Sequence, residues 1–307
     1  MTVLEATQKP LAATDPLAAL EEIINGAADL AALPQVVMRV MDLTNDGKAT
    51  ATDLERVIGM DQGLAAKILT LANSSYYGLP RQVSTLREAV VFLGFKTVRN
   101  LAMSITTFNL FLGKSDSASL ARRSVWRHSM DTAQCARLIT SLLHPAAQEA
   151  IGIDLAYTCA LLHDVGKIAT DRSRQSLFIA IMELTNSRHI RYSEIENQVF
   201  PFSHGQIGAA LAARWNYPPM LCEAIAFHHT PRAAELNPKL TAAVCLANEV
   251  AHFLEDPPTS DEGARFEAMH ESCREAMFPL RVSEDSLHAM TRACRVELDK
   301  GLSAQAF

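Results

Sequence analysis

The stretch Cys159-Ala-Leu-Leu-His-Asp-Val-Gly-Lys-Ile168 places three reactive side chains, His163, Asp164 and Lys167, at the end of an apolar, helix-forming run. On a helix His163 and Asp164 are about 100° apart, so both can face one centre, and Lys167 lies one turn beyond His163 on the same face. A histidine beside a carboxylate suits a divalent metal ion, and an ammonium group one turn away suits an anion bound to that metal. This stretch is therefore a candidate metal and phosphate site that needs further ligands from elsewhere.

The composition is typical of a folded protein. Hydrophobic residues make up 49% of the 307 positions and charged residues 20%, which is enough apolar material for the core of one large domain or two. The net charge of −6 argues against extensive binding of nucleic acid, because such binding usually shows as a strongly basic domain.

The cysteines and the N-terminus bear on the compartment. Six cysteines are scattered without a Cys-x-x-Cys pair, which fits reduced thiols rather than a disulfide framework. The chain has neither a basic N-terminus followed by an apolar segment nor a run of about 18 apolar residues. We expect a cytoplasmic protein without a membrane span, and the sequence leaves its oligomeric state open.

Apolar residues recur at helical spacing along the chain, which predicts an all-α fold. Three sequences have the form of a capping box that opens a helix: Thr52-Asp-Leu-Glu55, Thr85-Leu-Arg-Glu88 and Ser193-Glu-Ile-Glu196. In Asn73-Ser-Ser-Tyr-Tyr-Gly-Leu-Pro80 the glycine can take the left-handed position after a helix, and the proline prevents continuation. The chain is expected to turn sharply there.

Turn-forming residues divide the chain into four expected parts. Residues 1–17 are a polar leader, 18–116 an N-terminal helical half, 117–256 a helical half that carries the histidines, and 257–307 a C-terminal helical extension. The boundary between the halves is expected in the small-residue segment Gly113-Lys-Ser-Asp-Ser-Ala-Ser119.

The candidate ligands come from four successive predicted helices of the second half: His128, His163, Asp164, His204, His228 and His229. Helical bundles build metal sites in this way, with facing helices contributing inward-pointing ligands. Five histidines and one aspartate are enough for one or two ions, and they suit iron, manganese, nickel or zinc better than calcium or magnesium. The alternative is that these are separate capping, core and surface side chains that never meet.

The second half resembles the HD phosphohydrolase superfamily, particularly its HD-GYP branch. The resemblance lies in the order and context of His128, the His163-Asp164 pair with Gly166-Lys167, His204 before Gly208, and His228-His229. It implies that these histidines and Asp164 bind the metal, and that Asp164 and Lys167 take part in any catalysis.

The first half resembles the HDOD domain, an all-helical relative of the HD fold in bacterial signalling proteins. The resemblance covers roughly residues 20–255 and lies in five stretches: Leu33-Pro-Gln-Val36, Asp61-Gln-Gly-Leu-Ala-Ala-Lys-Ile-Leu69, Leu71-Ala-Asn-Ser-Ser-Tyr-Tyr-Gly-Leu-Pro80, Val83-Ser-Thr-Leu-Arg-Glu-Ala89 and Leu93-Gly-Phe-Lys-Thr-Val-Arg-Asn-Leu101. It implies a multi-helix bundle, with the N-terminal half packed on an HD-like half, that acts as a signalling module.

The chain departs from the HD pattern in two places. Asn248 stands where the pattern ends with an aspartate, so either the metal centre is altered or Glu249 substitutes. Where the HD-GYP branch has Gly-Tyr-Pro after its paired histidines, the chain reads Thr230-Pro-Arg-Ala-Ala-Glu-Leu236, which lowers the expectation of cyclic dinucleotide hydrolysis.

The resemblance therefore implies, first, a bacterial regulatory module of HDOD type that retains an HD-type metal centre. Its expected partners are signalling proteins and a phosphate-containing small molecule. The alternative is a metal-dependent phosphohydrolase similar to the phosphodiesterases. A di-iron oxygenase of the HD fold is a third, weaker alternative.

Overall fold

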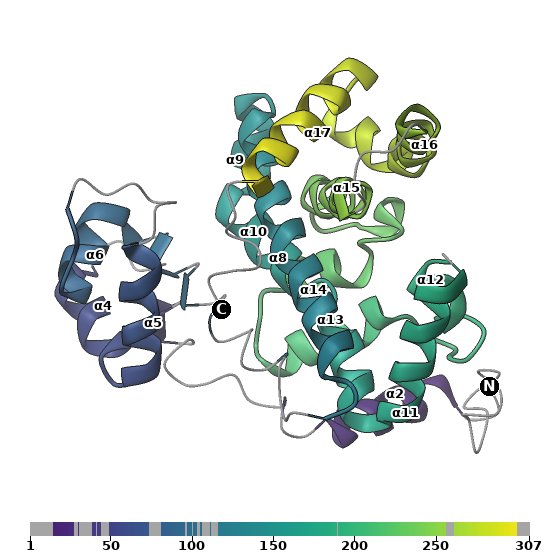
Figure 1. Ribbon diagram of the computed structural model, residues 1–307, viewed down its shortest axis with the longest axis horizontal. Coiled ribbons are helices and arrows are strands. Elements are labelled where there is room, and N and C mark those ends of the chain that lie inside the picture. The colour runs from purple at the N-terminus through teal and green to yellow at the C-terminus, as the bar shows by residue number, and fades with distance from the viewer. Residues whose placement is uncertain are drawn as a thin grey trace. The chain divides into compact units, whose positions relative to one another are not determined.

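Figure 1 shows the computed structural model of the 307-residue chain. The residues that the structure describes are 15–27, 30, 39–40, 42–43, 49–73, 81–95, 97–99, 101–102, 105, 111, 116–188, 190–255 and 261–299. Within these ranges every regular element is a helix, which confirms the all-α prediction. The chain forms two compact units, residues 33–110 with 296–307 and residues 1–32 with 111–295. The four-part division expected from the sequence stays a prediction.

The unit of residues 33–110 with 296–307 is built on three described helices: α4 Ala51–Ile58, α5 Gln62–Ala72 and α6 Leu86–Leu93. Ile58, Ile68 and Val90, one from each helix, are buried in a shared apolar cluster. Burying a side chain of this size stabilises the fold by roughly 1.5–3 kcal/mol, so this cluster holds the three helices together.

The capping residues set where these helices begin. Thr50, rather than Thr52, caps α4: its hydroxyl accepts from the Asp53 backbone N–H, and the Asp53 carboxylate accepts from the Thr50 N–H at 3.0 Å. The expected box at Thr52 is therefore wrong, because the same spacing two residues earlier starts the helix first. The Thr85 half of the expected capping box is confirmed, since its hydroxyl accepts from the Glu88 N–H at 3.1 Å, while the Glu88 carboxylate accepts from the Ser84 N–H at 2.8 Å.

The side chain of Asn73, just after α5, binds the backbone of Val83. Its amide donates to the carbonyl of Val83 at 2.9 Å and accepts from the Val83 N–H at 2.8 Å. The side chain thus makes the pair of hydrogen bonds that the backbone of a neighbouring β-strand would make. The expected left-handed glycine at Gly78 and the stop at Pro80 lie outside the described residues.

The unit of residues 1–32 with 111–295 contains the other described helices. These are α2 Pro16–Gly26, α8 Ser119–Leu142, α9 Pro145–Ile151, α10 Ile153–Leu162, α11 Val165–Arg188, α12 Tyr192–Glu196, α13 His204–Arg214, α14 Pro219–Ala226, the 3₁₀ turn η3 Pro231–Ala233, α15 Pro238–Glu255, α16 Glu262–Leu280, and α17 Glu284–Asp299 as far as Arg295. Helix α8 packs on α10 and α15, and α11 packs on α13 and α2 (Figure 1). The site lies where these two groups meet.

A buried ion pair ties α8 to α11. Arg122 is fully buried, and its guanidinium donates to Asp171 at 2.9 Å and to Asp116 at 2.6 Å. Two carboxylates compensate the desolvation of one buried cation. The pair fixes the start of α8 against α11, and so places His128 relative to His163.

The opening stretch forms a junction between two helices instead of one continuous helix. Helix α10 ends at Leu162, His163 and Asp164 form a turn, and α11 starts at Val165. The expectation that His163, Asp164 and Lys167 lie on one helix is wrong, because a turn at His163 and Asp164 separates α10 from α11. A Cβ on Gly166 would overlap the carbonyl oxygen of His204, so only glycine allows the start of α11 to approach the start of α13.

Candidate metal centre

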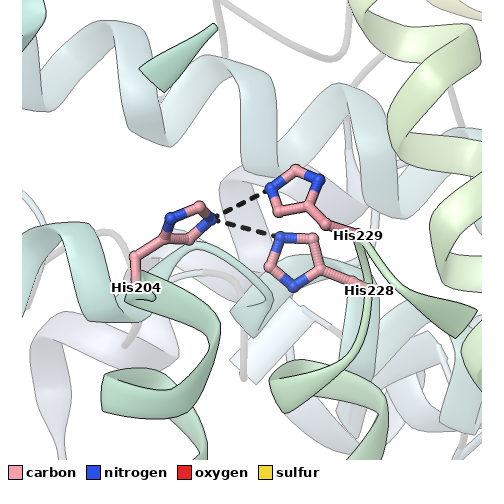
Figure 2. A group of neighbouring side chains, drawn as sticks. All are labelled: His204, His228 and His229. Carbon is pink, nitrogen blue, oxygen red and sulfur yellow. Dashed lines mark hydrogen bonds between the residues drawn. The ribbon is translucent and has the colours of Figure 1, made fainter. Parts of the chain in front are cut away.

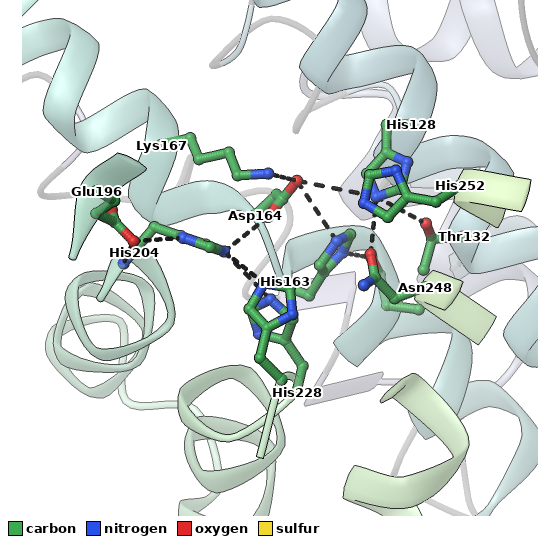
Figure 3. Close-up of polar contacts among 12 residues, drawn as sticks. His128, Thr132, His163, Asp164, Lys167, Glu196, His204, His228, Asn248 and His252 are labelled. Carbon is green, nitrogen blue, oxygen red and sulfur yellow. Dashed lines mark hydrogen bonds and ion pairs between the residues drawn. The ribbon is translucent and has the colours of Figure 1, made fainter. Parts of the chain in front are cut away.

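Three segments of the chain bring four histidines to Asp164. His163 precedes Asp164 at the α10–α11 junction, His204 is the first residue of α13, and His228 and His229 follow the end of α14. His163, His204 and His228 are fully buried, and Asp164 is 1% exposed. Figure 3 shows the His204 ring reaching both the Asp164 carboxylate and the ring of His228. An unpaired polar group buried this deeply destabilises the fold, so the atoms next to these side chains indicate which protonation states and ligands the site can hold.

The Asp164 carboxylate is surrounded by cationic and imidazole nitrogen atoms. Lys167 Nζ donates to Oδ2 at 2.7 Å, and His163 Nε2 lies 3.5 Å from the same oxygen. His204 Nε2 lies 3.2 Å from Oδ1. Burial raises the pKa of the Asp164 carboxyl, but its interactions with His163 and Lys167 more than offset this and hold the pKa well below its usual range. Asp164 is therefore ionised.

Three imidazole nitrogens face one another beside this carboxylate. His204 Nε2 lies 3.2 Å from His228 Nε2 and 3.2 Å from His229 Nε2, as Figure 2 shows. Burial lowers the pKa values of His228 and His229 well below the usual range, and it lowers that of His163 to about 3. These three rings are therefore neutral at pH 7 and offer lone pairs.

The other ring nitrogen of each fully buried histidine is already committed as a donor. The partners of Nδ1 are the carbonyl of Ala160 for His163 at 2.6 Å, the carbonyl of Ile225 for His228 at 2.7 Å, and the Glu196 carboxylate for His204 at 2.8 Å. A backbone carbonyl can only accept, so Nδ1 of His163 and of His228 carries the proton. Their Nε2 atoms are then lone-pair acceptors that point at the common centre.

Such an arrangement of acceptors calls for a cation. His163 Nε2 lacks a hydrogen-bond partner among the described residues, although it is buried. Burial lowers the pKa of His204, but the Glu196 carboxylate reverses this, so the pKa is raised overall and a proton on Nε2 is favourable. A proton on His204 Nε2 can be donated to only one of its neighbours, Asp164, His228 or His229, whereas a metal ion can bind several lone pairs at once. Histidines whose second nitrogen donates to a carbonyl or carboxylate are typical metal ligands.

His128 lies at the edge of this group. Its Nε2 is 4.0 Å from Asp164 Oδ2, but it is closer to Asn248 Oδ1, at 2.9 Å. Its Nδ1 lies 2.6 Å from the carboxylate of Glu255. The place of His128 among the ligands of the Asp164 centre stays a prediction.

Glu249 does not replace the aspartate that the HD pattern expects. Its two carboxylate oxygens accept from the guanidinium of Arg191 at 2.6 and 2.5 Å, in a bidentate pair. This pairing directs the Glu249 carboxylate to Arg191, so the alternative in which Glu249 supplies the missing ligand is wrong for this conformation. Among the described residues, Asp164 is thus the carboxylate that the converging Nε2 atoms face.

Glu196 has a role that the sequence pattern did not predict. It was expected as the last residue of a capping box at Ser193, but α12 begins at Tyr192 with Arg191 as its N-cap. The fully buried Glu196 carboxylate accepts instead from the backbone N–H of His204 at 2.8 Å and from its ring. The sequence did hold a signal for this contact, because Glu196 lies only eight residues before the candidate ligand His204. The match of Glu196 to a capping box led to a different interpretation.

A pocket of about 340 Å³ opens beside the centre. Its lining includes Asp164, Lys167, His229 and Arg191, together with apolar side chains such as Met182. The Lys167 ammonium also lies 4.9 Å from the centre of the Tyr192 ring. Lys167 and Arg191 are paired with Asp164 and Glu249, so an anion in this pocket would share these cations with the carboxylates.

Comparison with known proteins agrees with the fold. Residues 30–231 match the HDOD domain family. An uncharacterized protein of Treponema pallidum is 27% identical over 228 residues, which are 74% of this chain and 43% of that protein. The chain thus spans less than half of the length of this relative.

Solved structures share the fold at low sequence identity. An HDOD domain protein of unknown function from Geobacter sulfurreducens has a TM-score of 0.70 and 24% identity, covering 94% of this chain and 99% of that one. A protein from Shewanella amazonensis described as a candidate phosphohydrolase has a TM-score of 0.68 and 22% identity, covering 92% and 98%. A candidate signal transduction protein from Marinobacter aquaeolei has a TM-score of 0.64 and 22% identity, covering 96% and 69%. None of the described helices is long and apolar enough to cross a membrane.

Proposed function

This chain belongs to the HDOD domain family, and we propose that it works as a bacterial signal-transduction module whose state depends on metal and anion binding at the Asp164 centre. The observation that carries the proposal is the gathering of buried imidazole Nε2 atoms beside one carboxylate. Those of His163 and His204 face Asp164, and those of His228 and His229 face His204 Nε2. Structural cores rarely gather lone pairs in this way, because each buried acceptor requires a partner.

The proposed ligands are Asp164 Oδ1 and Oδ2 and the Nε2 atoms of His163, His204, His228 and His229. This set of nitrogen and carboxylate donors suits iron, manganese, nickel or zinc, in one or two ions. A bound ion would supply positive charge and Lewis acidity to an anion in the pocket. Glu196 would hold His204 in the required orientation, and the carbonyls of Ala160 and Ile225 would do the same for their histidines.

The anion is proposed to be a phosphate-containing small molecule. Lys167 is held 2.7 Å from Asp164 and lines the pocket, so it can exchange part of this pairing for a phosphate oxygen. Arg191 lies at the same wall but is engaged by Glu249, which leaves Lys167 as the primary anion contact. Ligand occupancy would then be communicated to partner signalling proteins, in line with the signal transduction role given to the Marinobacter relative.

Two features favour a regulator over an efficient enzyme. Asn248 contacts His128 through its amide oxygen, and Glu249 is paired with Arg191, so neither adds a second carboxylate to the centre. A loss of negative charge at the centre alters both metal binding and the activation of water.

A metal-dependent phosphohydrolase is the second candidate. The observation in its favour is that Asp164 and Lys167 both line the pocket next to the histidines. In that case Asp164 and Lys167 would be catalytic, with Lys167 holding the phosphate that is cleaved. The name of the Shewanella relative points the same way for that protein.

An assay separates the two candidates. Metal-loaded protein is incubated with cyclic dinucleotides and simple phosphoesters, and binding of inorganic phosphate is measured in parallel. The regulator proposal expects phosphate to bind while turnover stays at the level of the His163→Ala variant. Efficient hydrolysis that His163→Ala abolishes would overturn it in favour of the enzyme.

A further inference from the structure

A second cluster of ligand-type side chains lies on the wall of the same pocket. His128 comes from α8, and His252 and Glu255 come from the last turn of α15. The His128 and His252 rings are stacked, with centres 4.0 Å apart and planes 20° apart. Each ring directs Nδ1 at the Glu255 carboxylate, at 2.6 Å from His128 and 3.2 Å from His252. His252 and Glu255 are three residues apart, which places them on one helix face.

Asn248 determines which nitrogen of His128 is available. Its amide nitrogen faces the Glu249 carboxylate at 3.4 Å, which directs its oxygen at His128 Nε2, 2.9 Å away. An amide oxygen only accepts, so Nε2 carries the proton. Nδ1 faces a carboxylate oxygen of Glu255 at 2.6 Å, a distance that a proton bridges in the metal-free chain. A metal ion bound there would take the place of this proton, as metal ions do at histidine ligands.

The carboxylate of this cluster is accessible to solvent. The side chains of Glu255 and His252 are 38% and 37% exposed, which leaves a path for an ion from solvent. The donor atoms of His128, His252 and Glu255 lie within 4.8 Å of one another.

We propose that His128 Nδ1, His252 Nδ1 and the Glu255 carboxylate form a second transition-metal site, with Asn248 as the residue that positions His128. Two imidazoles and a glutamate are a donor set that binds Zn²⁺ with one coordination position left open. The open position would face the pocket, because all three side chains line it. The site assigns to His128 a place different from the one that the sequence predicted at the Asp164 centre. It uses none of the atoms named above as ligands of that centre, so it does not rest on the function proposed above.

This assignment gives Asn248 a positioning role. As a neutral acceptor it holds the Nε2–H of His128, which is the role that carboxylates and carbonyls play behind metal-bound histidines. The asparagine thus turns His128 away from Asp164 and toward Glu255.

The test is a zinc titration of the full-length, metal-free chain, followed by elemental analysis of the gel-filtered protein. Glu255→Gln is expected to bind one equivalent fewer than the wild type. Glu267→Gln, an exposed glutamate of α16, is the matched control and is expected to bind the wild-type number. His204→Ala is expected to lose zinc from the Asp164 centre and to retain the equivalent that Glu255→Gln removes.

Three further results bear on the proposal. Loss of the same equivalent in His252→Ala, with helicity retained, would support it independently of Glu255→Gln. Nitrogen-15 NMR of labelled histidines is expected to show zinc at Nδ1 of His128 with the proton at Nε2. Equal zinc content in the wild type, Glu255→Gln and His252→Ala would overturn the second site. If only the Asp164 centre fails, His204→Ala retains wild-type zinc while Glu255→Gln still loses its equivalent.

Discussion

Glu196 Oε2 lies 2.8 Å from both the backbone nitrogen and the Nδ1 atom of His204, so one buried carboxylate fixes the main chain and the ring of the same histidine. The contact holds the first residue of α13 and orients His204 Nε2 toward Asp164. It also increases the basicity of the imidazole, because a negative charge faces its N–H.

Replacing Glu196 with glutamine should weaken metal binding. The amide keeps an oxygen acceptor but loses the charge, and losses behind metal ligands typically cost about 10–100-fold in affinity. Competition with a chromophoric chelator measures the change. Glu194→Gln, an exposed neighbour on the same helix, should leave the affinity unchanged. Equal affinities for the Glu196 and Glu194 variants would mean that the contact is only structural.

The metal-free protein should lose stability as the pH falls from 7 to 5, partly through His163. The unfolded chain binds a proton at His163 near the ordinary pKa, whereas the folded chain, with a pKa of about 3, does not. A histidine with a lowered pKa therefore lowers the free energy of unfolding as the pH drops below about 6.5, by up to about 1.4 kcal/mol per pH unit.

Urea unfolding at pH 7 and pH 5 measures this effect. Metal-free His163→Ala should lose less stability between the two pH values than the metal-free wild type, since the variant lacks that proton uptake on unfolding. An identical loss in the two proteins would show that His163 is not held neutral. His270→Ala, on α16, is the matched control and should behave as the wild type.

Lys167→Met should reduce the affinity of metal-loaded protein for inorganic phosphate by about tenfold or more, because a charge-assisted contact is worth about 1.5–3 kcal/mol. The metal content should stay at the wild-type level, since Lys167 is not a proposed ligand. Calorimetry with phosphate provides the measurement, and Lys239→Met, an exposed lysine on α15, serves as the control. Unchanged phosphate affinity would remove Lys167 from the anion site.

Asn248→Asp should tighten metal binding at the Asp164 centre, on the order of tenfold, because it adds a negative charge beside His128, whose Nε2 lies 4.0 Å from Asp164. The change also restores the residue of the HD pattern, so phosphodiesterase activity should rise from the low level expected of the unmodified protein. Asn216→Asp, at an exposed position, controls for the added charge. Weaker metal binding in Asn248→Asp than in Asn216→Asp would contradict the expected role of position 248.

The order of the motifs predicted which parts of the chain would meet. His163, Asp164, His204, His228 and His229 do come together, although gaps of up to 40 residues separate them, because the family pattern carries information that periodicity does not. The geometry at His163 and Asp164 could not be predicted in the same way. An apolar run followed by polar residues predicts one helix. The junction between α10 and α11 depends on the packing of Gly166 against the start of α13, which the sequence does not reveal.

The polar partners were harder to foresee. Glu196 matched a capping pattern, and a local pattern cannot show that its carboxylate reaches His204 on the next helix. His252 and Glu255 did carry a usable signal, since residues three apart on a helix share a face. What the sequence lacked was the packing of α15 on α8, which places both beside His128.

The most direct test of the central claim is elemental analysis of protein purified without an affinity metal column, for the wild type and for the variant that combines His163→Ala with Asp164→Ala. The account predicts iron, manganese, nickel or zinc in the wild type. It predicts fewer bound ions in the variant, by the number that the Asp164 centre holds, with helicity by circular dichroism largely retained because the apolar core is untouched. Equal metal content in the two proteins would contradict it.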